Sequence, residues 1–274
     1  MLLIIGCKSK IAPHIINILR KSEYFLSHKN EGFDFIIDLN NIEDVDFDIR
    51  ITHAILLSSI TSINFCNKHP EISRKINGSN TIRLINILNK RGIKVLFPSS
   101  TCVFSCKSKT IKDENSQTNG DTIYGKIKAE VEKKIIDNEL NTILRLTKIV
   151  SPDDQLLQIW KKELINKKVI TAYKDLRLAP LSVFTVAEFI KNWYQNEFNG
   201  IIHLSPSEDI SYFDLAQKLC LFLSIDQSYI KPSSVFDSGK EVLYIPQIAN
   251  LQCKNKFSKS LLLDNELERI FKSL

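Results

Sequence analysis

The sequence contains no C-x-x-C pair. Its six cysteines are scattered along the chain: Cys7, Cys66, Cys102, Cys106, Cys220 and Cys253. This scatter predicts neither a zinc site nor a disulfide framework, so we expect no metal. Isolated cysteines are typical of proteins kept in a reducing compartment, and we therefore expect a cytoplasmic protein.

Long apolar runs are also missing. No stretch approaches the roughly 20 apolar residues that a membrane-spanning helix needs. The apolar run from Met1 to Gly6 has no basic leader and is too short for a signal peptide. We therefore expect no membrane partner.

The charge balance is only mildly basic, with 37 Lys and Arg against 31 Asp and Glu, a net charge of +6. The lysines are spread among Ile and Asn and form no basic stripe with interleaved aromatic residues, so no nucleic acid partner is expected. Anionic nucleotides as ligands would suit this charge equally well. With 274 residues, 43% hydrophobic and 25% charged, the chain is long enough for one large domain or for a large and a small one.

The stretch with most chemistry runs from Val95 to Glu132. An apolar run ends at Ser100, a polar loop covers 105–122, and a helical pattern then begins. Ser100 falls at a strand end, where an open α/β sheet presents its reactive groups. Tyr124 and Lys128 are four residues apart and so share one face of the predicted helix.

A hydroxyl, a phenol and an ammonium that converge can move a proton to or from a carbonyl or alcohol. A free tyrosine titrates near pH ~10, and a cation one helical turn away favours the phenolate and lowers that pKa. Hydride would have to come from a cofactor, because no side chain supplies it. The alternative interpretation is that Tyr124 and Lys128 form a chance Y-x-x-x-K pattern at the start of an amphipathic helix.

Apolar runs alternate with helical patterns along the first half of the chain. Runs at 2–5, 24–26 and 54–59 are typical of buried parallel strands. A helical pattern over 72–89 ends near Gly92, and another strand begins at Ile93. This alternation predicts an α/β protein with a Rossmann-like, doubly wound parallel sheet. Strand 2–5, a tight turn and a helical pattern from Ile11 would open its dinucleotide-binding unit.

These segments together resemble a known family. S-S-T-C-V-F at 99–104, followed by I-Y-G-K-I-K-A-E-V-E at 123–132, is similar to the extended short-chain dehydrogenase/reductases that act on nucleotide sugars, and within them to the dTDP-4-dehydrorhamnose reductase group. The resemblance extends over nearly the whole chain. It includes an N-x-x-G-T-like segment at 77–81, where Asn80 replaces the glycine, and Arg145-x-Thr147 at a strand end.

The resemblance implies an NADP(H)- or NAD(H)-dependent oxidoreductase acting on a nucleotide-linked sugar, with reduction of a 4-keto group in surface-polysaccharide sugar biosynthesis as the leading expectation. Tyr124 would give a proton to the carbonyl oxygen, Lys128 would lower the pKa of that tyrosine and bind the nicotinamide ribose, and Ser100 would hold the carbonyl oxygen. The cofactor-binding residues that it implies are Gly6, Ser9, Lys10, Ile11, Asp38, Leu39, Ser58, Ser59, Tyr124, Lys128 and Thr147.

The turn after the first strand departs from the family's G-x-x-G-x-x-G. Only Gly6 remains, with Ser9 and Ala12 at the other two positions, and a positive φ at Ser9 would be strained. The second strand is followed by Ser27-His28-Lys29 and no acidic residue, which favours NADP(H). Asp38 fits either a contact with the adenine ring or the cap of a helix that would include residues 42–44.

We expect residues 1–150 to form the dinucleotide-binding domain and 151–274 a smaller mixed α/β substrate-binding lobe interleaved with it. Helical patterns cover 153–168 and 185–195, and the tail 257–274 ends in an amphipathic helical pattern. Members of the family often dimerise through helices that flank the sheet, so a homodimer is an open expectation.

Two other functions stay open. A nucleotide-sugar 4-epimerase would share the same machinery. A dehydratase is disfavoured because Thr101-Cys102 stands where family dehydratases carry an acidic pair. The shortened glycine pattern also allows a non-catalytic, reductase-like binding or regulatory protein.

Overall fold

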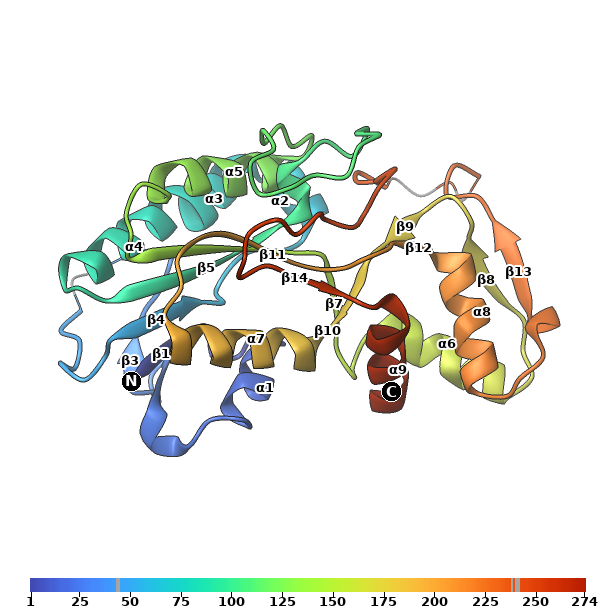
Figure 1. Cartoon of the computed structure of the whole chain (residues 1–274), viewed down its shortest axis with the longest axis horizontal. Coiled ribbons are helices and arrows are strands. Elements are labelled where there is room, and N and C mark those ends of the chain that lie inside the picture. The colour runs from blue at the N-terminus through green and yellow to red at the C-terminus, as the bar shows by residue number, and fades with distance from the viewer. Residues whose placement is uncertain (43–44, 238, 240–241) are drawn as a thin grey trace.

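The computed structural model describes residues 1–42, 45–237, 239 and 242–274. At its centre lies an eight-stranded sheet in which every strand pair is parallel (Figure 1). From one edge to the other the strands are β3 (Phe35–Ile36), β2 (Tyr24–His28), β1 (Leu2–Ile5), β4 (His53–Leu56), β5 (Lys94–Ser100), β6 (Asn141–Leu146), β11 (Gly200–Pro206) and β14 (Lys259–Leu261). The chain direction across the sheet reverses between β1 and β4, and ligands of such sheets bind beside that point.

Helices cover both faces of this sheet (Figure 1). One face carries α3 (Pro70–Arg74), α4 (Thr81–Lys90) and α5 (Ile123–Ile135), with α2 (Ile63–Lys68) beside α5, and the opposite face carries α1 (Ala12–Ile16) and α7 (Val183–Asn196). The segment from α3 to α4 is one helical run with a π-helical turn at Lys75–Asn80.

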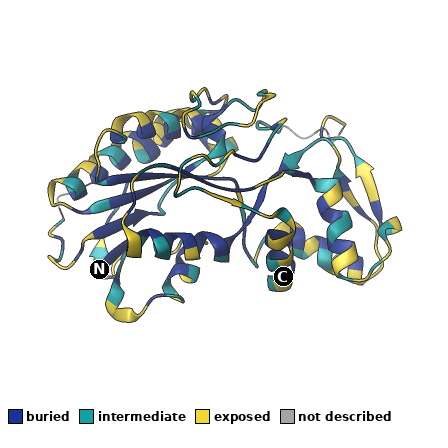
Figure 2. Cartoon of the chain, viewed as in Figure 1, coloured by how far each residue is buried: buried dark blue, intermediate teal, exposed yellow. Residues whose placement is uncertain are grey.

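Both faces of the central strands are apolar, which is why the sequence shows unbroken apolar runs. Leu2 and Ile4 pack in the core beneath α7, whereas Leu3 and Ile5 pack in the core beneath α4. Successive strand residues point to opposite faces, so a strand buried on both sides must be apolar throughout. Figure 2 shows this burial as a dark band across the sheet.

A smaller group of elements lies at one end of the sheet and has its own apolar core. Its helices are α6 (Gln155–Ile165), α8 (Tyr212–Phe222) and α9 (Leu263–Ser273). Its strand pairs are β7 (Lys148–Val150) with β10 (Pro180–Ser182), β8 (Ile170–Tyr173) with β13 (Ile230–Ser233), and the antiparallel β9 (Arg177–Leu178) with β12 (Ile210–Ser211). Between these elements the chain returns twice to the main sheet, as β11 and as β14.

The parallel doubly wound sheet confirms the fold class expected from the sequence. Some local predictions need correction. The helix expected from Ile11 spans only Ala12–Ile16, and Ser9 does not adopt a positive φ; in this turn the positive φ belongs to Gly6. The expected strain at Ser9 is therefore absent.

The tail ends in the amphipathic helix α9, as predicted, but a strand precedes it. Residues 259–261 form β14 before α9 begins, because the open edge of β11 offers backbone partners that an amphipathic pattern does not reveal. The helical pattern expected over 153–168 is α6, in which Leu157 and Trp160 are buried and Leu156 is 39% exposed. The strand expected to end at Arg145-x-Thr147 is β6, which ends at Leu146, and β7 begins directly after Thr147.

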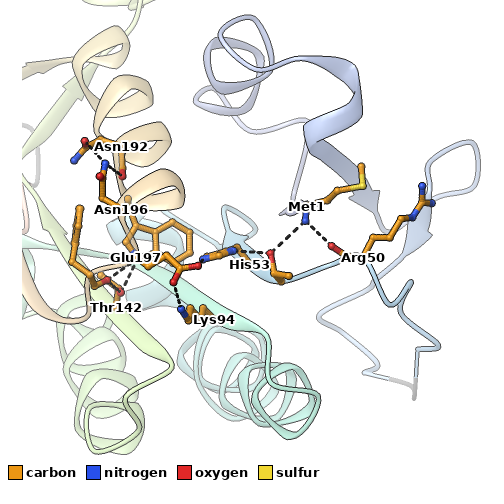
Figure 3. A network of polar contacts seen from close by, with 11 residues as sticks. Met1, Arg50, His53, Lys94, Thr142, Asn192, Asn196 and Glu197 are labelled. Carbon is orange, nitrogen blue, oxygen red and sulfur yellow. Dashed lines mark hydrogen bonds and ion pairs between the residues drawn. The ribbon is translucent and has the colours of Figure 1, made fainter.

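At the amino ends of the central strands a polar network joins distant parts of the chain (Figure 3). The amino group of Met1 donates to the Arg50 carbonyl over 2.6 Å and lies 3.3 Å from Thr52 Oγ1. His53 Nδ1 is 2.9 Å from that same hydroxyl, and its Nε2 is 3.4 Å from Glu197 Oε1. This network lies at the end of the sheet opposite to the strand ends where ligands bind.

Candidate functional site

A cleft of about 820 Å³ opens at the carboxyl ends of β1, β4, β5 and β6. Its floor comes from the sheet and its far wall from the smaller group of elements, including residues 176–179 and Tyr212. The residues expected from the sequence that line this cleft are Ser9, Lys10, Ile11, Ser59, Ser100, Tyr124, Lys128 and Thr147. The sheet thus brings together side chains from four separate strand ends.

The start of α5 is pressed against the end of β5. Thr122 caps the helix and accepts a hydrogen bond from the Gly125 amide over 3.0 Å. A Cβ atom at Gly125 would lie only 1.9 Å from the carbonyl oxygen of Cys102. Glycine is therefore required here, because any side chain would push Tyr124 and the strand end apart.

Tyr124 is 9% exposed and belongs to an apolar cluster with Cys66 and Cys102, against which Tyr244 packs. Burial raises the pKa of the Tyr124 phenol above its ordinary value, and the two thiols act in the same direction. At neutral pH the phenol therefore carries its proton. A depressed tyrosine pKa, expected from the sequence, does not describe this structure.

Lys128 lies one helical turn after Tyr124 without contacting its hydroxyl. Its ammonium donates to the carbonyl oxygen of Pro98 over 2.8 Å and lies 4.3 Å from the centre of the Phe97 ring. The distance to the centre of the Tyr124 ring is 5.9 Å. Burial lowers the pKa of Lys128 to about 8, against an opposing effect of Glu132.

Ser100 is the last residue of β5. Its hydroxyl oxygen accepts a hydrogen bond from the Cys102 amide over 3.2 Å and caps the short turn Thr101–Val103. That contact uses a lone pair of the hydroxyl, so its proton can still be donated to an oxygen in the cleft. The cap fixes the position of the serine without using up its donor.

Two residues that line the cleft carry hydroxyls that lack partners in the described part of the chain. Ser59 Oγ and Thr147 Oγ1 are buried, and neither has a hydrogen-bond partner among the described residues. Buried polar groups are nearly always paired, so two orphaned hydroxyls in residues that line one cleft indicate a ligand with polar groups. They fit the sugar and phosphate groups of a dinucleotide.

Gly6 fits the same ligand. Its φ is +88°, and a Cβ atom there would lie 2.4 Å from Ser58 Oγ and 2.5 Å from the Ser58 amide nitrogen. The turn can therefore pass close to the end of β4 only with glycine at this position. Ser9 and Lys10 continue the turn; Ser9 Oγ accepts from the Ala12 amide over 3.3 Å, and Lys10 pairs with Asp153 over 3.4 Å.

Four expected cofactor residues do not line the cleft. Gly6 and Ser58 lie behind its surface, in contact with each other. Leu39 is a core residue with 6% exposure. Asp38 borders a separate cavity of about 190 Å³ and accepts from the Asn40 amide over 2.9 Å. Asp38 thus closes a turn; the helix that it was alternatively expected to cap would include residues 43 and 44, which lie outside the described residues.

The structure adds cleft residues that the sequence did not identify as site residues. Tyr244, from the segment between β13 and β14, donates to the Thr101 carbonyl over 3.4 Å and lies beside Tyr124. No pattern in the sequence links it to a site so far away along the chain. Arg177 also lines the cleft, and its Nε donates to Asp209 Oδ1 over 2.8 Å. Ser211 caps the following helix, α8, and accepts a hydrogen bond from the Asp214 amide.

A buried polar network supports the strand end from behind. The Ser99 hydroxyl donates to the Glu132 carboxylate over 2.5 Å, and Arg145 Nη2 donates to the same carboxylate over 2.7 Å. Arg145 Nη1 lies 3.3 Å from Nε2 of His203, a residue of β11. Burial lowers the pKa of His203 to about 4, so this histidine is neutral. The network joins β5, α5, β6 and β11.

A doubly wound parallel sheet with serine, tyrosine and lysine around one cleft is the architecture of the extended short-chain dehydrogenase/reductases. The model of the family described as the RmlD substrate binding domain matches residues 1–263. The chain belongs to this family.

Solved structures show the same fold along the whole chain. A dTDP-4-dehydrorhamnose reductase from Bacillus anthracis, in complex with NADP, is 18% identical with a TM-score of 0.80, covering 100% of this chain and 99% of that one. A second such reductase, from Clostridium acetobutylicum, is 16% identical with a TM-score of 0.81, covering 99% and 98%.

A dTDP-glucose 4,6-dehydratase from Streptomyces venezuelae, with NAD bound, is 12% identical with a TM-score of 0.74, covering 99% of this chain and 96% of that one. A search of curated proteins gives no match. At these identities the solved structures establish the fold.

Two further observations bear on the expectations. In the described part of the chain, no group of three or more His, Cys, Asp or Glu side chains is placed to hold a metal ion. No helix of residues 1–42, 45–237 and 242–274 is long and apolar enough to cross a membrane.

Proposed function

We propose that this chain is an NAD(P)-dependent oxidoreductase that reduces a keto group of a nucleotide-linked sugar. The observation that carries the proposal is the convergence of Ser100, Tyr124 and Lys128 on one cleft, next to the two orphaned hydroxyls of Ser59 and Thr147. Membership of the family and the NADP found with the Bacillus anthracis reductase support it.

In this proposal the dinucleotide, when bound, supplies the hydride. Ser100 donates a hydrogen bond to the carbonyl oxygen of the sugar, and Tyr124 gives its proton to the same oxygen. Because burial raises the pKa of Tyr124, the phenol is already protonated at neutral pH, which suits reduction. Such proton donation contributes roughly 10²–10⁴-fold to the rate.

Lys128 has two roles in this proposal. Its ammonium lies on the same helix face as the phenol and stabilises the phenolate left after proton transfer. It also donates to the ribose hydroxyls on the nicotinamide side. Its present acceptor, the Pro98 carbonyl, fixes the ammonium at the strand end, so little reorientation is needed when the ribose arrives.

The proposal divides the chain by task. Residues 1–150 bind the dinucleotide, with Ser9, Lys10 and Ile11 at the turn after β1. Residues 151–274 supply the substrate side, where Arg177 offers a guanidinium to the diphosphate of the nucleotide. A cytoplasmic location and a homodimer remain predictions.

The test is Tyr124→Phe in the full chain, assayed by oxidation of NADPH or NADH with 4-keto nucleotide sugars. Turnover should fall roughly 10²–10⁴-fold, while cofactor binding, followed by nicotinamide fluorescence, stays nearly intact. Unchanged turnover would refute the role of Tyr124. Dinucleotide retained through purification would point to an epimerase, and failure to bind either cofactor would point to a non-catalytic protein.

A further inference from the structure

The cleft carries an excess of positive charge. Its lining includes five cationic side chains and, among the residues that the structure describes, no carboxylate. The five are Lys8, Lys10, Lys128, Lys148 and Arg177. In the proposed function both ligands, the dinucleotide and the nucleotide sugar, carry a diphosphate, which accounts for part of this charge.

Four of the five cations have a task in the proposed function. Lys8 and Lys10 lie in the turn after β1, on the side of the dinucleotide. Lys128 serves the catalytic tyrosine, and Arg177 is assigned to the diphosphate of the nucleotide sugar. Lys148 is the cation that this mechanism leaves without a task.

Lys148 is the first residue of β7 and projects towards the substrate side of the cleft. Successive residues of a strand point to opposite sides. Ile149 packs against the apolar core of the main sheet, whereas Val150 is buried in the core of the smaller group of elements. Lys148 lies on the same side of the strand as Val150. Its exposed side chain therefore leaves the strand towards the smaller group, which also supplies Leu178 and Tyr212 to the cleft.

Within the part of the chain that the structure describes, the ammonium of Lys148 forms no ion pair and donates no hydrogen bond. Arg177, by contrast, donates to Asp209 over 2.8 Å, and Lys10 pairs with Asp153 over 3.4 Å. A ligand that fills the cleft takes water away from Lys148, and a charge that loses its water without gaining a partner is unfavourable. A ligand with an anionic group beside Lys148 avoids this penalty.

We propose that Lys148 binds a carboxylate on the sugar, so that the substrate of this chain is an acidic nucleotide sugar. The inference rests on the proposed function and names the class of its substrate. One ammonium balances the single charge of a carboxylate, whereas a phosphate monoester carries about two charges. Lys148 is thus a residue that determines specificity, and it takes no part in the transfer of hydride or proton.

The competing assignment gives Lys148 to the diphosphate of the nucleotide, beside Arg177. A planar guanidinium suits a diphosphate better, because it can donate two parallel hydrogen bonds to it. Asp209 holds Arg177 in the cleft, since its carboxylate accepts from Nε and its main-chain carbonyl accepts from Nη2 over 3.1 Å. The two assignments differ in one measurable respect: a lysine on the diphosphate would affect acidic and neutral sugars equally.

The experiment compares sugars that differ only at C6. The full chain, saturated with NADPH or with NADH, is titrated by calorimetry with UDP-glucose and UDP-glucuronic acid, and with the two corresponding dTDP-sugars. These sugars carry a 4-hydroxyl and cannot be reduced, so only binding is measured. The member of each pair with the carboxylate should bind roughly tenfold tighter or more, as expected for a charge-assisted hydrogen bond. The ratio should fall as salt is added, because Lys148 is exposed.

Lys148→Met should bring the two members of each pair to nearly equal affinity and leave the affinity for the neutral sugar nearly unchanged. Lys148→Glu should reverse the preference, since it places a carboxylate opposite a carboxylate. Lys162→Met is the matched control, because Lys162 is an exposed lysine of α6, in the same smaller group, and lies outside the lining of the cleft. It should leave the ratio unchanged. Thermal unfolding of each variant checks that the fold is intact.

Equal binding of acidic and neutral sugars by the parent chain would overturn the inference while leaving the proposed reductase standing. A preference that survives in Lys148→Met would place the carboxylate elsewhere and would also overturn it. Equal losses of affinity for both sugars in that variant would assign Lys148 to the diphosphate, which overturns it as well. If the chain binds no dinucleotide, the proposed function fails, and the inference fails with it.

Discussion

The ammonium of Lys128 donates its hydrogen bond to the carbonyl oxygen of Pro98, 2.8 Å away, and stands 5.9 Å from the centre of the Tyr124 ring. The lysine is thus anchored to the strand that ends in Ser100, and the tyrosine is left to its apolar surroundings. The two members of the Y-x-x-x-K pattern share a helix face without sharing a hydrogen bond.

The first prediction concerns the pH dependence of turnover. Burial lowers the pKa of Lys128 to about 8, so its positive charge is lost as the pH rises through about 8. Turnover should fall over that range, because neutral Lys128 no longer stabilises the phenolate of Tyr124. Initial rates measured from neutral to alkaline pH provide the check.

Lys128→Arg is the control, since arginine keeps its charge at alkaline pH. The variant should be slower than the parent chain, and its turnover should not decline near pH 8.

The stability of the parent chain should change in the opposite direction to its turnover. Between about 8 and the ordinary value of 10.5 the unfolded chain binds more protons at this lysine, so the free energy of unfolding rises with pH there. A decline in rate caused by unfolding would contradict this account.

The second prediction concerns the close approach at Gly125. Gly125→Ala should destabilise the protein by roughly 1–3 kcal/mol or more, because the new Cβ would lie 1.9 Å from a backbone oxygen that cannot move aside. Gly78→Ala is the matched control in the helical run that packs on α5. Its Cβ would meet only Ile127 Cγ2, at 3.6 Å, so this change should be neutral or slightly stabilising. Urea unfolding of both variants decides; equal losses would be contrary to the prediction.

The third prediction concerns acid stability and the network of Figure 3. His53 is buried between Thr52, Glu197 and two aromatic rings, and burial lowers its pKa to about 4. Between about 4 and the ordinary value of 6.5 the unfolded chain binds more protons there, so stability falls as the pH falls through this window, by up to roughly 1.4 kcal/mol per pH unit.

His53→Gln can keep the contact with Thr52 and cannot take up a proton. In urea unfolding across the acid range it should lose stability less steeply than the parent chain. The parent slope should not vanish entirely in the variant, because His203 also has a pKa lowered to about 4. Parallel slopes for the two proteins would show that His53 is not the titrating group.

The fourth prediction concerns the buried ion pair of Glu132 and Arg145, which are 3% and 2% exposed. Arg145→Met should cost roughly 3–5 kcal/mol, because it leaves a buried carboxylate without its cation. The double variant Glu132→Leu with Arg145→Met should recover part of that loss. If the stability lost in the double variant equalled the sum of the losses in the two single variants, the two residues would not be coupled as the structure indicates.

Much of this fold could be predicted because the burial of each strand is visible in the strand's own sequence. Strands such as β1 and β4 are buried on both faces, and an unbroken apolar run is the direct result. The carboxyl ends of parallel strands meet at one edge, so Ser100 at the end of β5 and Tyr124 at the start of the next helix had to come close.

The rest depends on contacts that no local pattern encodes. Tyr244 reaches the cleft from a segment without regular structure, and β14 forms because β11 offers an open edge. The pKa of Tyr124 follows from its burial among Cys66 and Cys102, which only the folded chain brings together. The sequence pattern predicts the effect of Lys128 on the pKa of Tyr124 and contains no sign of the burial that raises this pKa.

The return of the chain to the main sheet has a consequence for dissecting this protein. A fragment ending near residue 150 would keep β6 but lose β11, so the backbone groups of β6 that pair from Thr142 to Leu146 would be left open. Unpaired edges of this kind invite pairing with other molecules. Residues 1–150 and residues 151–274 are therefore each expected to aggregate when expressed without the other.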